Sequence, residues 1–266
     1  MTETKKNVLF GAIAGVSSRI VISPLDIIKI RIQVDFKNLP KYSSISSTLL
    51  SILREEGVLA FWKGNSAALL LYASYSAIQF SVFDRLENIP TFVSGAIAGF
   101  IATTCTYPFD ILRTKFALRK NRDRPLTILK LVAAQEGITG FYRGLTPTLV
   151  QIVPYMSIVF YSQKIYAEKL NGFSFGEFLG GAMAGVTGRI ACSPLDVIRK
   201  RLQASDSLKY VLDVDSYSSF KDCAIKIYHK EGLRAFYRGL GASCLKAAPA
   251  SAISFYVYRK LQKSFP

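Results

Sequence analysis

The sequence is poor in the residue types on which most enzymes and metal proteins depend. Among its 266 residues there is one histidine, His229, and there are four cysteines, none of them in a Cys-x-x-Cys pair. A zinc site or a disulfide framework is therefore not expected. The chain also contains no recognisable nucleophile paired with a base and no glycine-rich phosphate loop, so it predicts neither an enzyme nor a bound cofactor.

Long, uniformly apolar runs are also missing, although half of the residues are hydrophobic and the mean hydropathy is +0.25. Six stretches are nevertheless long enough to cross a bilayer if each forms a helix. Interrupted spans of this kind are typical of a bundle that lines a polar cavity, with its charged residues facing inward. The sequence thus predicts an all-α membrane protein with six transmembrane helices, near residues 8–32, 64–83, 91–112, 145–163, 175–198 and 239–258.

Acidic residues are few, since 18 Asp and Glu stand against 34 Lys and Arg and the net charge is +16. Such a surplus can mark a nucleic-acid-binding protein. Here, however, segments 35–63, 117–143 and 204–238 would lie on one side of the expected membrane and carry sixteen bases, against eight on the other side. This bias follows the positive-inside rule and suits an anionic lipid surface, so no nucleic-acid partner is expected.

Two motifs recur three times along the chain. The first reads Pro-x-Asp-x-x-base-x-base, and the second reads Glu-Gly, four residues, an aromatic residue, a base and Gly. The chain is therefore a tandem triplicate, which predicts one domain of three repeats that can enclose a shared axial site. The repeats cover approximately residues 8–85, 90–167 and 175–262; the first motif spans residues 24–31, 108–115 and 194–201, and the second spans 56–64, 136–144 and 231–239.

The first motif predicts a narrow, charged end of the bundle. A proline inside a helix removes a backbone hydrogen bond and kinks the helix, so three such prolines would bend three helices toward one axis. Each acid is followed by a base at the third position after it. Each acid can pair with the base of the next repeat, and the three pairs then form a ring that acts as a gate. The alternative is three exposed pairs, each within its own helix. The residues concerned are Pro24, Asp26 and Lys29, then Pro108, Asp110 and Arg113, then Pro194, Asp196 and Arg199.

Other features recur in register with these motifs. Each first helix carries two glycines four residues apart, which predicts close helix packing. Short amphipathic helices are expected at residues 43–56, 125–136 and 218–231, along the membrane surface. The last glycine of each second motif would begin a helix, whose free N–H groups favour a lipid phosphate. The paired glycines are Gly11 and Gly15, Gly95 and Gly99, and Gly181 and Gly185.

These motifs resemble the signature of the mitochondrial carrier family, and the resemblance covers nearly the whole chain in three copies. It implies a pseudo-threefold bundle of six transmembrane helices with three short surface helices on the matrix side. It also implies the mitochondrial inner membrane as location, with both termini toward the intermembrane space. A member of the family exchanges its substrate through alternating opening of a cytoplasmic and a matrix gate, as a monomer that binds an anionic lipid, cardiolipin.

The resemblance also implies where a substrate binds. The family's contact points lie seven residues after each aromatic-base-Gly glycine, and further cavity positions lie five residues before each motif proline. The helical period places two tyrosines one turn from these contact points. With no acid among these residues, the bases imply a ligand that carries more than one negative charge. The residues are Leu71, Gln151 with Ile152, and Lys246, then Arg19, Thr103 and Arg189, then Tyr75 and Tyr155.

Within the family, segment 19–31, segment 61–65 and Lys246 resemble the thiamine pyrophosphate carriers. The bases would bind the diphosphate, while aromatic and amide side chains, among them Tyr72 and Gln79, would hold the thiazolium and pyrimidine rings. The same set would accept a nucleotide, coenzyme A or another phosphorylated cofactor, which therefore stay alternatives. A more remote alternative is a membrane scaffold or proton leak that transports no solute.

The expected cytoplasmic gate departs from the family pattern of aromatic-acid-x-x-base. The first copy keeps Asp84 but has Glu87 at the base position, and the other copies carry Lys164 and Arg259 where an acid belongs. The family's pairing scheme then leaves one pair of reversed polarity, Glu87 with Arg259. A gate held by one solvated pair is weak, about 1 kcal/mol, so we expect the outward-open state to be the resting one.

Overall fold

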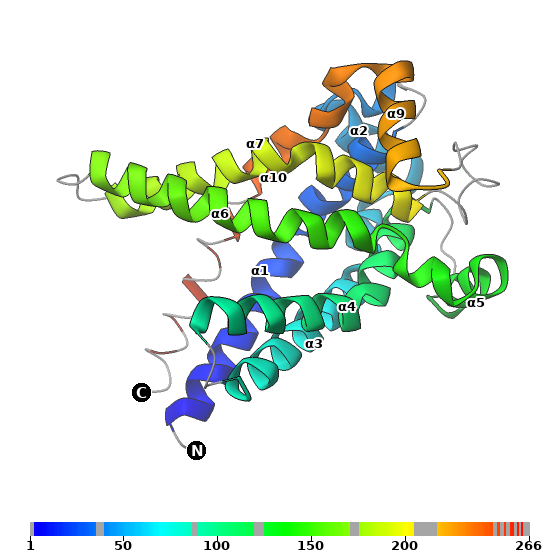
Figure 1. Ribbon diagram of the computed structural model, residues 1–266. Coiled ribbons are helices and arrows are strands. Elements are labelled where there is room, and N and C mark those ends of the chain that lie inside the picture. The colour runs from blue at the N-terminus through cyan, green and yellow to red at the C-terminus, as the bar shows by residue number, and fades with distance from the viewer. Residues whose placement is uncertain are drawn as a thin grey trace.

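The computed structural model describes residues 3–35, 40–86, 90–119, 125–170, 176–204 and 217–246, together with single positions between 249 and 262. In these parts of the chain every regular element is a helix (Figure 1), which confirms the predicted fold class at that level. The helices are α1 Glu3–Val34, α2 Ile45–Glu56, α3 Asn65–Asp84, α4 Thr91–Leu118, α5 Pro125–Glu136, α6 Leu145–Lys169, α7 Gly176–Ala204, α9 Phe220–Glu231 and α10 Leu240–Leu245, with the 3-10 helices η1 Pro40–Tyr42, η2 Val58–Trp62, η3 Ile138–Tyr142 and η4 Leu233–Tyr237.

Each repeat follows the expected order of a long helix, a short helix and a second helix. The bounds of α2, α5 and α9 agree with the predicted surface helices to within two residues. The second helix of the third repeat is described as α10 only, and the predicted span near residues 239–258 is described without a gap only as far as Lys246.

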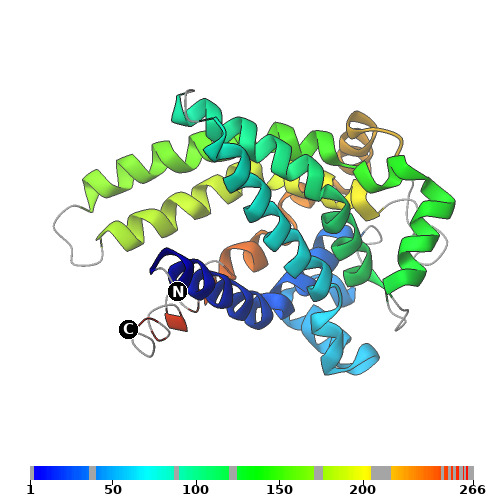
Figure 2. The ribbon, with the colours of Figure 1, turned by 90° about the horizontal axis from the view of Figure 1, so that it is seen from below.

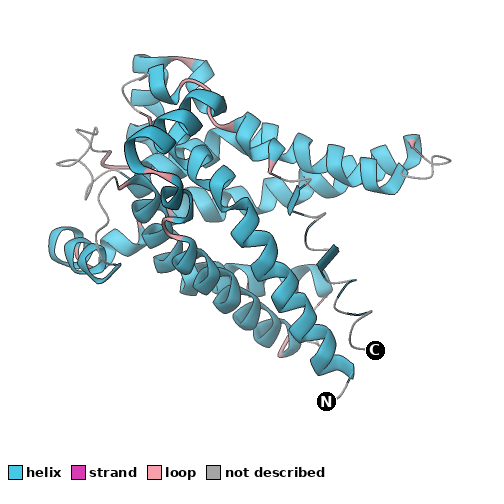
Figure 3. Ribbon diagram, turned by 180° about the vertical axis from the view of Figure 1, so that it is seen from behind, coloured by secondary structure: helices cyan, strands magenta, loops and turns pink. Residues whose placement is uncertain are grey.

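The long helices splay apart from one end of the molecule. α3 packs along α4, and α6 packs along α7. The short helices α2, α5 and α9 lie at the end where the long helices come together, and the N-terminal end of α1 lies at the other end (Figures 1 and 3). The view from below shows the same divergence of α6 and α7 from α1 (Figure 2).

The motif prolines lie inside helices, as predicted. Pro24 is within α1, Pro108 within α4 and Pro194 within α7, and each helix continues for more than two turns beyond its proline. A further proline, Pro154, lies within α6. Because the helices continue, the acids and bases of the first motif all lie on helical segments beyond the prolines, at the end where the bundle is narrow.

The predicted close packing of the paired glycines is wrong at most of the positions described. A methyl group added at Gly15, Gly95, Gly181 or Gly185 would have no heavy atom within 4 Å, and at Gly99 it would meet only the Tyr75 hydroxyl at 3.7 Å. The side of the helix on which a side chain would stand at Gly15, Gly95, Gly181 and Gly185 is therefore open, and these glycines do not serve a close approach of another helix.

By contrast, the last glycine of each second motif is tightly constrained. Gly64 has φ of +79°, a left-handed conformation that only glycine adopts without strain. A methyl group on it would lie 2.9 Å from the carbonyl oxygen of Arg113. Gly144 and Gly239 repeat both features, against Arg199 and Lys29. The start of each second helix thus lies directly against the backbone of a predicted gate base.

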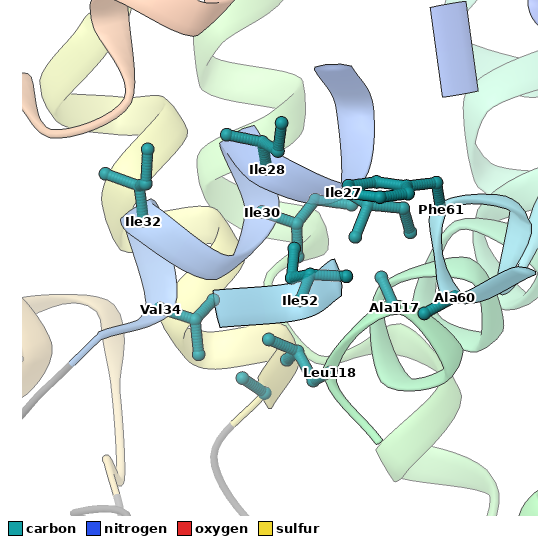
Figure 4. Close-up of a cluster of buried hydrophobic side chains, with 11 residues drawn as sticks. Ile27, Ile28, Ile30, Ile32, Val34, Ile52, Ala60, Phe61, Ala117 and Leu118 are labelled. Atoms are coloured by element: carbon teal, nitrogen blue, oxygen red, sulfur yellow. The ribbon is translucent and has the colours of Figure 1, made fainter. Parts of the chain in front are cut away.

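A buried apolar cluster joins all three repeats at the narrow end (Figure 4). Ile27 and Ile28 of α1 pack with Ile52 of α2 and Phe61 of η2, and the ends of α4 and α7 contribute small or aliphatic side chains. Burying aliphatic groups stabilises this end by about 25 cal/mol for each square ångström removed from water. The remaining members of the cluster are Ile30, Ile32, Val34, Ala60, Ala117, Leu118 and Ala204.

Two segments meet the length and hydropathy requirements for crossing a membrane, namely Val58–Asp84 and Ile138–Tyr166, within the residues described. Their outward faces carry large exposed apolar side chains. Leu70 and Phe80 on α3 are 54% and 68% exposed, and Val153 and Phe160 on α6 are 62% and 63% exposed. Such faces are stable only against an apolar surrounding.

Candidate functional site

The acids and bases of the first motif form a ring of three ion pairs. Each acid pairs with the base of the next repeat, which is the cyclic arrangement considered from the sequence. The alternative, pairing within one helix, is not what the described residues adopt. The shortest contacts are Asp26 Oδ2 to Arg113 Nη2 at 2.5 Å, Asp110 Oδ2 to Arg199 Nη2 at 2.7 Å, and Asp196 Oδ2 to Lys29 Nζ at 3.2 Å.

Above this ring lies a cavity of about 470 Å³. Most of the side chains predicted to contact a substrate line it, and two do not. Arg19 and Gln79 are not among the lining residues, although the guanidinium carbon of Arg19 lies 3.6 Å from the centroid of the ring of Tyr72, which does line the cavity. The predicted contacts that line the cavity are Leu71, Tyr72, Tyr75, Gln151, Ile152, Tyr155, Arg189 and Lys246, and Thr103 lines it as well.

The expectation that no acid lies near these bases is wrong. The ammonium of Lys246 is 2.7 Å from Oδ1 of Asp26, and Gln151 donates a hydrogen bond of 2.9 Å to Oδ1 of Asp196. Arg189 donates to the backbone carbonyl of Ser243 at 2.7 Å. Lysine and glutamine side chains are long enough to reach from the contact points to the acids of the ring.

The cavity is nevertheless strongly positive. Six bases line it against three acids, so three positive charges are not neutralised by the acids of the ring. Carboxylates and phosphates are the groups that such a surplus favours. The bases are Lys29, Arg113, Arg189, Arg199, Lys200 and Lys246, and the acids are Asp26, Asp110 and Asp196.

One of these bases, Lys200, was missed by the sequence reasoning. Its ammonium contacts Gln203 Oε1 at 2.7 Å, Thr114 Oγ1 at 2.9 Å and Asp110 Oδ1 at 3.4 Å. Comparison of the three repeats could have identified Lys200, because the matching residue of the first motif is Ile30 in the first repeat and Thr114 in the second. The third repeat alone places a charge there.

The comparisons with known proteins agree with this geometry. A family model described as mitochondrial carrier protein matches three successive segments, residues 2–91, 85–174 and 171–266. The chain belongs to the mitochondrial carrier family. It is similar to proteins named mitochondrial thiamine pyrophosphate carrier 1 from three fungi: Phaeosphaeria nodorum at 41% identity, Coccidioides immitis at 38% and Neurospora crassa at 36%. These alignments cover 95%, 95% and 96% of this chain and 90% of each relative.

A second set of charges braces the narrow end of this carrier. In each repeat the last base of the first motif forms an ion pair with the glutamate of the second motif, and both partners are largely buried. The pairs are Arg31 with Glu56, Lys115 with Glu136, and Arg201 with Glu231.

Glu56 belongs to the surface helix α2 and illustrates the electrostatics of this brace. Burial opposes its ionisation, but hydrogen bonds from Arg31 and Lys63 outweigh burial and lower the pKa of its carboxyl below the ordinary value. Lys63 also donates to the backbone carbonyl of Arg119 at 2.9 Å, and so ties the first repeat to the second.

The other repeats make the same connection onward. Arg143 donates to the carbonyl of Tyr217, and Arg238 donates to the carbonyl of Asp35 at 2.8 Å. The bases of the second motif therefore link each repeat of the carrier to the next.

At the splayed end the carrier offers no corresponding ring among the residues described. Asp84 lies exposed at the end of α3, and Lys164 lies exposed on α6. In the described part of the chain no ion pair is found for either of them. Glu87 and Arg259 lie outside the described residues, so the pair of reversed polarity stays a prediction.

Proposed function

We propose that this carrier exchanges thiamine pyrophosphate across the mitochondrial inner membrane by alternating access. The observation that carries the proposal is the cavity, which is lined by six bases, three acids and four tyrosine rings. The fungal relatives named thiamine pyrophosphate carrier, at 36–41% identity over almost the whole chain, support the same substrate.

We assign the diphosphate to the basic side of the cavity. Lys246 and Arg189 line the cavity, and the guanidinium of Arg19 stacks on the ring of Tyr72. Phosphate oxygens accept strong, charge-assisted hydrogen bonds from ammonium and guanidinium groups. An anion can recruit Lys246 from Asp26 because the ring leaves the cavity with a positive surplus.

The aromatic part of the substrate is assigned to tyrosine and amide side chains of the same cavity. Tyr75 and Tyr155 supply ring faces, on which the cationic thiazolium is favoured. Gln151 supplies an amide for the pyrimidine, and Leu71 with Ile152 supplies an apolar surface. Gln79 has no part in this assignment because it does not line the cavity.

The membrane arrangement is part of the proposal. Six transmembrane helices in a pseudo-threefold bundle would place α2, α5 and α9 on the matrix side and both termini toward the intermembrane space. The exposed apolar faces of α3 and α6 and the bias of basic residues support this orientation. Cardiolipin would bind at the helix starts marked by Gly64, Gly144 and Gly239, where free N–H groups favour a phosphate, and the protein would act as a monomer.

The two gates then have unequal strength. The matrix gate is the ring of three ion pairs, closed in the conformation described, with the cavity above it. The cytoplasmic gate would depend on Glu87 and Arg259. A closed matrix ring and a weak cytoplasmic gate make the outward-open state the resting one.

Exchange uptake into liposomes tests the proposal. Purified full-length protein is reconstituted with internal thiamine pyrophosphate, and uptake of the labelled compound is measured with unlabelled thiamine pyrophosphate, thiamine, ADP and coenzyme A as competitors. We expect thiamine pyrophosphate to compete best. Thiamine, which lacks the diphosphate group, should compete poorly. Stronger competition by ADP or coenzyme A would assign the carrier to that substrate instead, and uptake equal to that of protein-free liposomes would refute transport of this panel.

A further inference from the structure

Two acids of the ring divide their carboxylate oxygens between a gate base and a residue of the cavity wall. Asp26 gives Oδ2 to the gate base Arg113 and Oδ1 to Lys246. Asp196 gives Oδ2 to the gate base Lys29 and Oδ1 to Gln151. The second partner is in both cases the contact-point residue of the preceding repeat in the cyclic order, from the wall of the cavity.

The third acid breaks this pattern. The cyclic order assigns Asp110 to the contact point of the first repeat, which is Leu71, and leucine has no hydrogen-bonding side-chain atom. Instead, Lys200 lies 3.4 Å from Oδ1 of Asp110, and Gln203 donates to its Oδ2 at 2.6 Å. Both belong to α7, the helix that also carries the gate base Arg199.

We propose that Lys200 supplies Asp110 with the connection that Leu71 cannot make, so that the three pairs of the ring respond unequally to substrate. This inference rests on the proposed function, in which a phosphorylated anion enters the cavity. An anion that takes the N–H donors of Lys246 and Gln151 competes with Asp26 and Asp196 for them. Each of these acids then keeps its gate base but loses its bond to the cavity wall, so the closed ring loses two of the contacts that stabilise it.

The third pair does not respond in the same way. The ammonium of Lys200 has three donors, and Asp110, Thr114 and Gln203 take them. Asp110 therefore keeps its additional partners when the substrate occupies the contact points. The ring has two substrate-sensitive pairs and one pair that is braced from within its own layer, so the Asp110–Arg199 pair is the last to separate.

A single-cysteine reporter tests this division. In a background with the four native cysteines changed to serine, Thr103→Cys places a thiol on the cavity wall. A membrane-impermeant maleimide applied on the matrix side of proteoliposomes labels this thiol only while the ring is open. The labelling rate is measured with and without thiamine pyrophosphate, and a thermal-shift titration of the same protein reports binding separately.

We expect thiamine pyrophosphate to raise the labelling rate of the reporter protein. Gln151→Leu and Lys246→Met should each raise the substrate-free rate about tenfold, because each removes a hydrogen bond to a charged group, and should reduce the stimulation by substrate. Leu70→Met is the matched control, since Leu70 is exposed on the neighbouring position of α3 and does not line the cavity, and its substrate-free rate should stay within about twofold of the parent.

The converse experiment rebuilds the missing connection. Lys200→Thr should raise the substrate-free rate while stimulation by thiamine pyrophosphate persists. Adding Leu71→Gln to Lys200→Thr should lower the rate again, because the amide can reach Asp110 as Gln151 reaches Asp196. The Leu71→Gln change adds a hydrogen bond to the ring. It therefore stays informative if Gln151→Leu or Lys246→Met, which each remove a hydrogen bond, fails to fold.

Two results overturn the inference. One is an unchanged substrate-free rate in both Gln151→Leu and Lys246→Met, and the other is failure of Leu71→Gln to slow labelling in the Lys200→Thr protein. If the parent neither binds nor exchanges thiamine pyrophosphate, the proposed substrate is wrong. The substrate-free rates of the same variants still decide whether these residues hold the ring.

Discussion

The guanidinium of Arg19 stacks on the ring of Tyr72, 3.6 Å from its centroid, and the hydroxyl of the same tyrosine accepts a hydrogen bond of 3.2 Å from the gate base Arg113. Tyr72 lines the cavity, and it thus contacts one base through its ring and the ring of ion pairs through its hydroxyl. Its two functions can be separated by substitution.

Tyr72→Phe should keep the stacking on Arg19 and lose only the contact with Arg113, which also retains Asp26. Tyr72→Leu should lose both, and the KM for uptake should rise about fivefold, because a cation over an aromatic ring is worth about 1 kcal/mol. Uptake kinetics of the two variants in liposomes measure the difference. Equal KM values for both would show that the stacking has no part in substrate binding.

Charge swaps in the ring should be tolerated unequally. Lys29→Asp with Asp196→Lys should recover most of the uptake that either single change reduces more than about tenfold. Recovery is expected there because the amide of Gln151 can turn to accept a hydrogen bond as readily as it donates one.

The same swap between Asp26 and Arg113 should not recover, because Lys246 would then face a base at 2.7 Å. Adding Lys246→Gln to that swap should restore uptake, again measured in liposomes. Recovery of the two-residue swap without the third change would contradict the contact between Lys246 and Asp26.

Gly64→Ala should lower the free energy of unfolding by about 2 kcal/mol, because the left-handed φ strains any residue with a Cβ atom and the methyl group meets the Arg113 carbonyl at 2.9 Å. Gly95→Ala is the control, since it has open space around it and alanine favours a helix. Thermal unfolding in detergent compares them. A melting temperature for Gly64→Ala equal to that of the parent would be inconsistent with the tight turn.

Glu56→Gln should destabilise the protein by about 3 kcal/mol at neutral pH, because it leaves the buried Arg31 without its ionised partner. Glu55→Gln changes the neighbouring, exposed acid and should cost less than about 1 kcal/mol. Since the folded pKa of Glu56 lies below its ordinary value, its contribution is present above about pH 4.5 and is lost as the pH falls below it. Unfolding measured from pH 7 to pH 4 should show the difference between wild type and Glu56→Gln decreasing.

The sequence predicted the arrangement of helices well because the repeats reinforced one another. Three in-register copies fixed the place of each motif proline, and the three short helices were found within two residues of their expected bounds. The cyclic pairing of Asp26, Asp110 and Asp196 was also accessible, because identical spacing in three copies leaves few alternatives.

What the sequence could not supply was contact between layers. Lys246 and Asp26 are 220 residues apart, and their bond depends on how far α10 and α1 approach each other. The paired glycines misled for the same reason, since the motif promotes packing only where a second helix faces the glycines, and a methyl group added at Gly95 or Gly181 would meet no heavy atom within 4 Å. Lys200 was not predicted because the matching residues, Ile30 and Thr114, carry no charge, so no repeated motif marks its position.

The apolar cluster at the narrow end has a consequence for how the chain is made. It joins Ile28 near the start of the chain to Ala204 in the third repeat, and contacts so distant in sequence form late. A chain that ends after its second repeat could form only the Asp26–Arg113 pair of the ring, because both other pairs need a residue of α7. Assembly of the first helix is therefore completed only when the last repeat has arrived in the membrane.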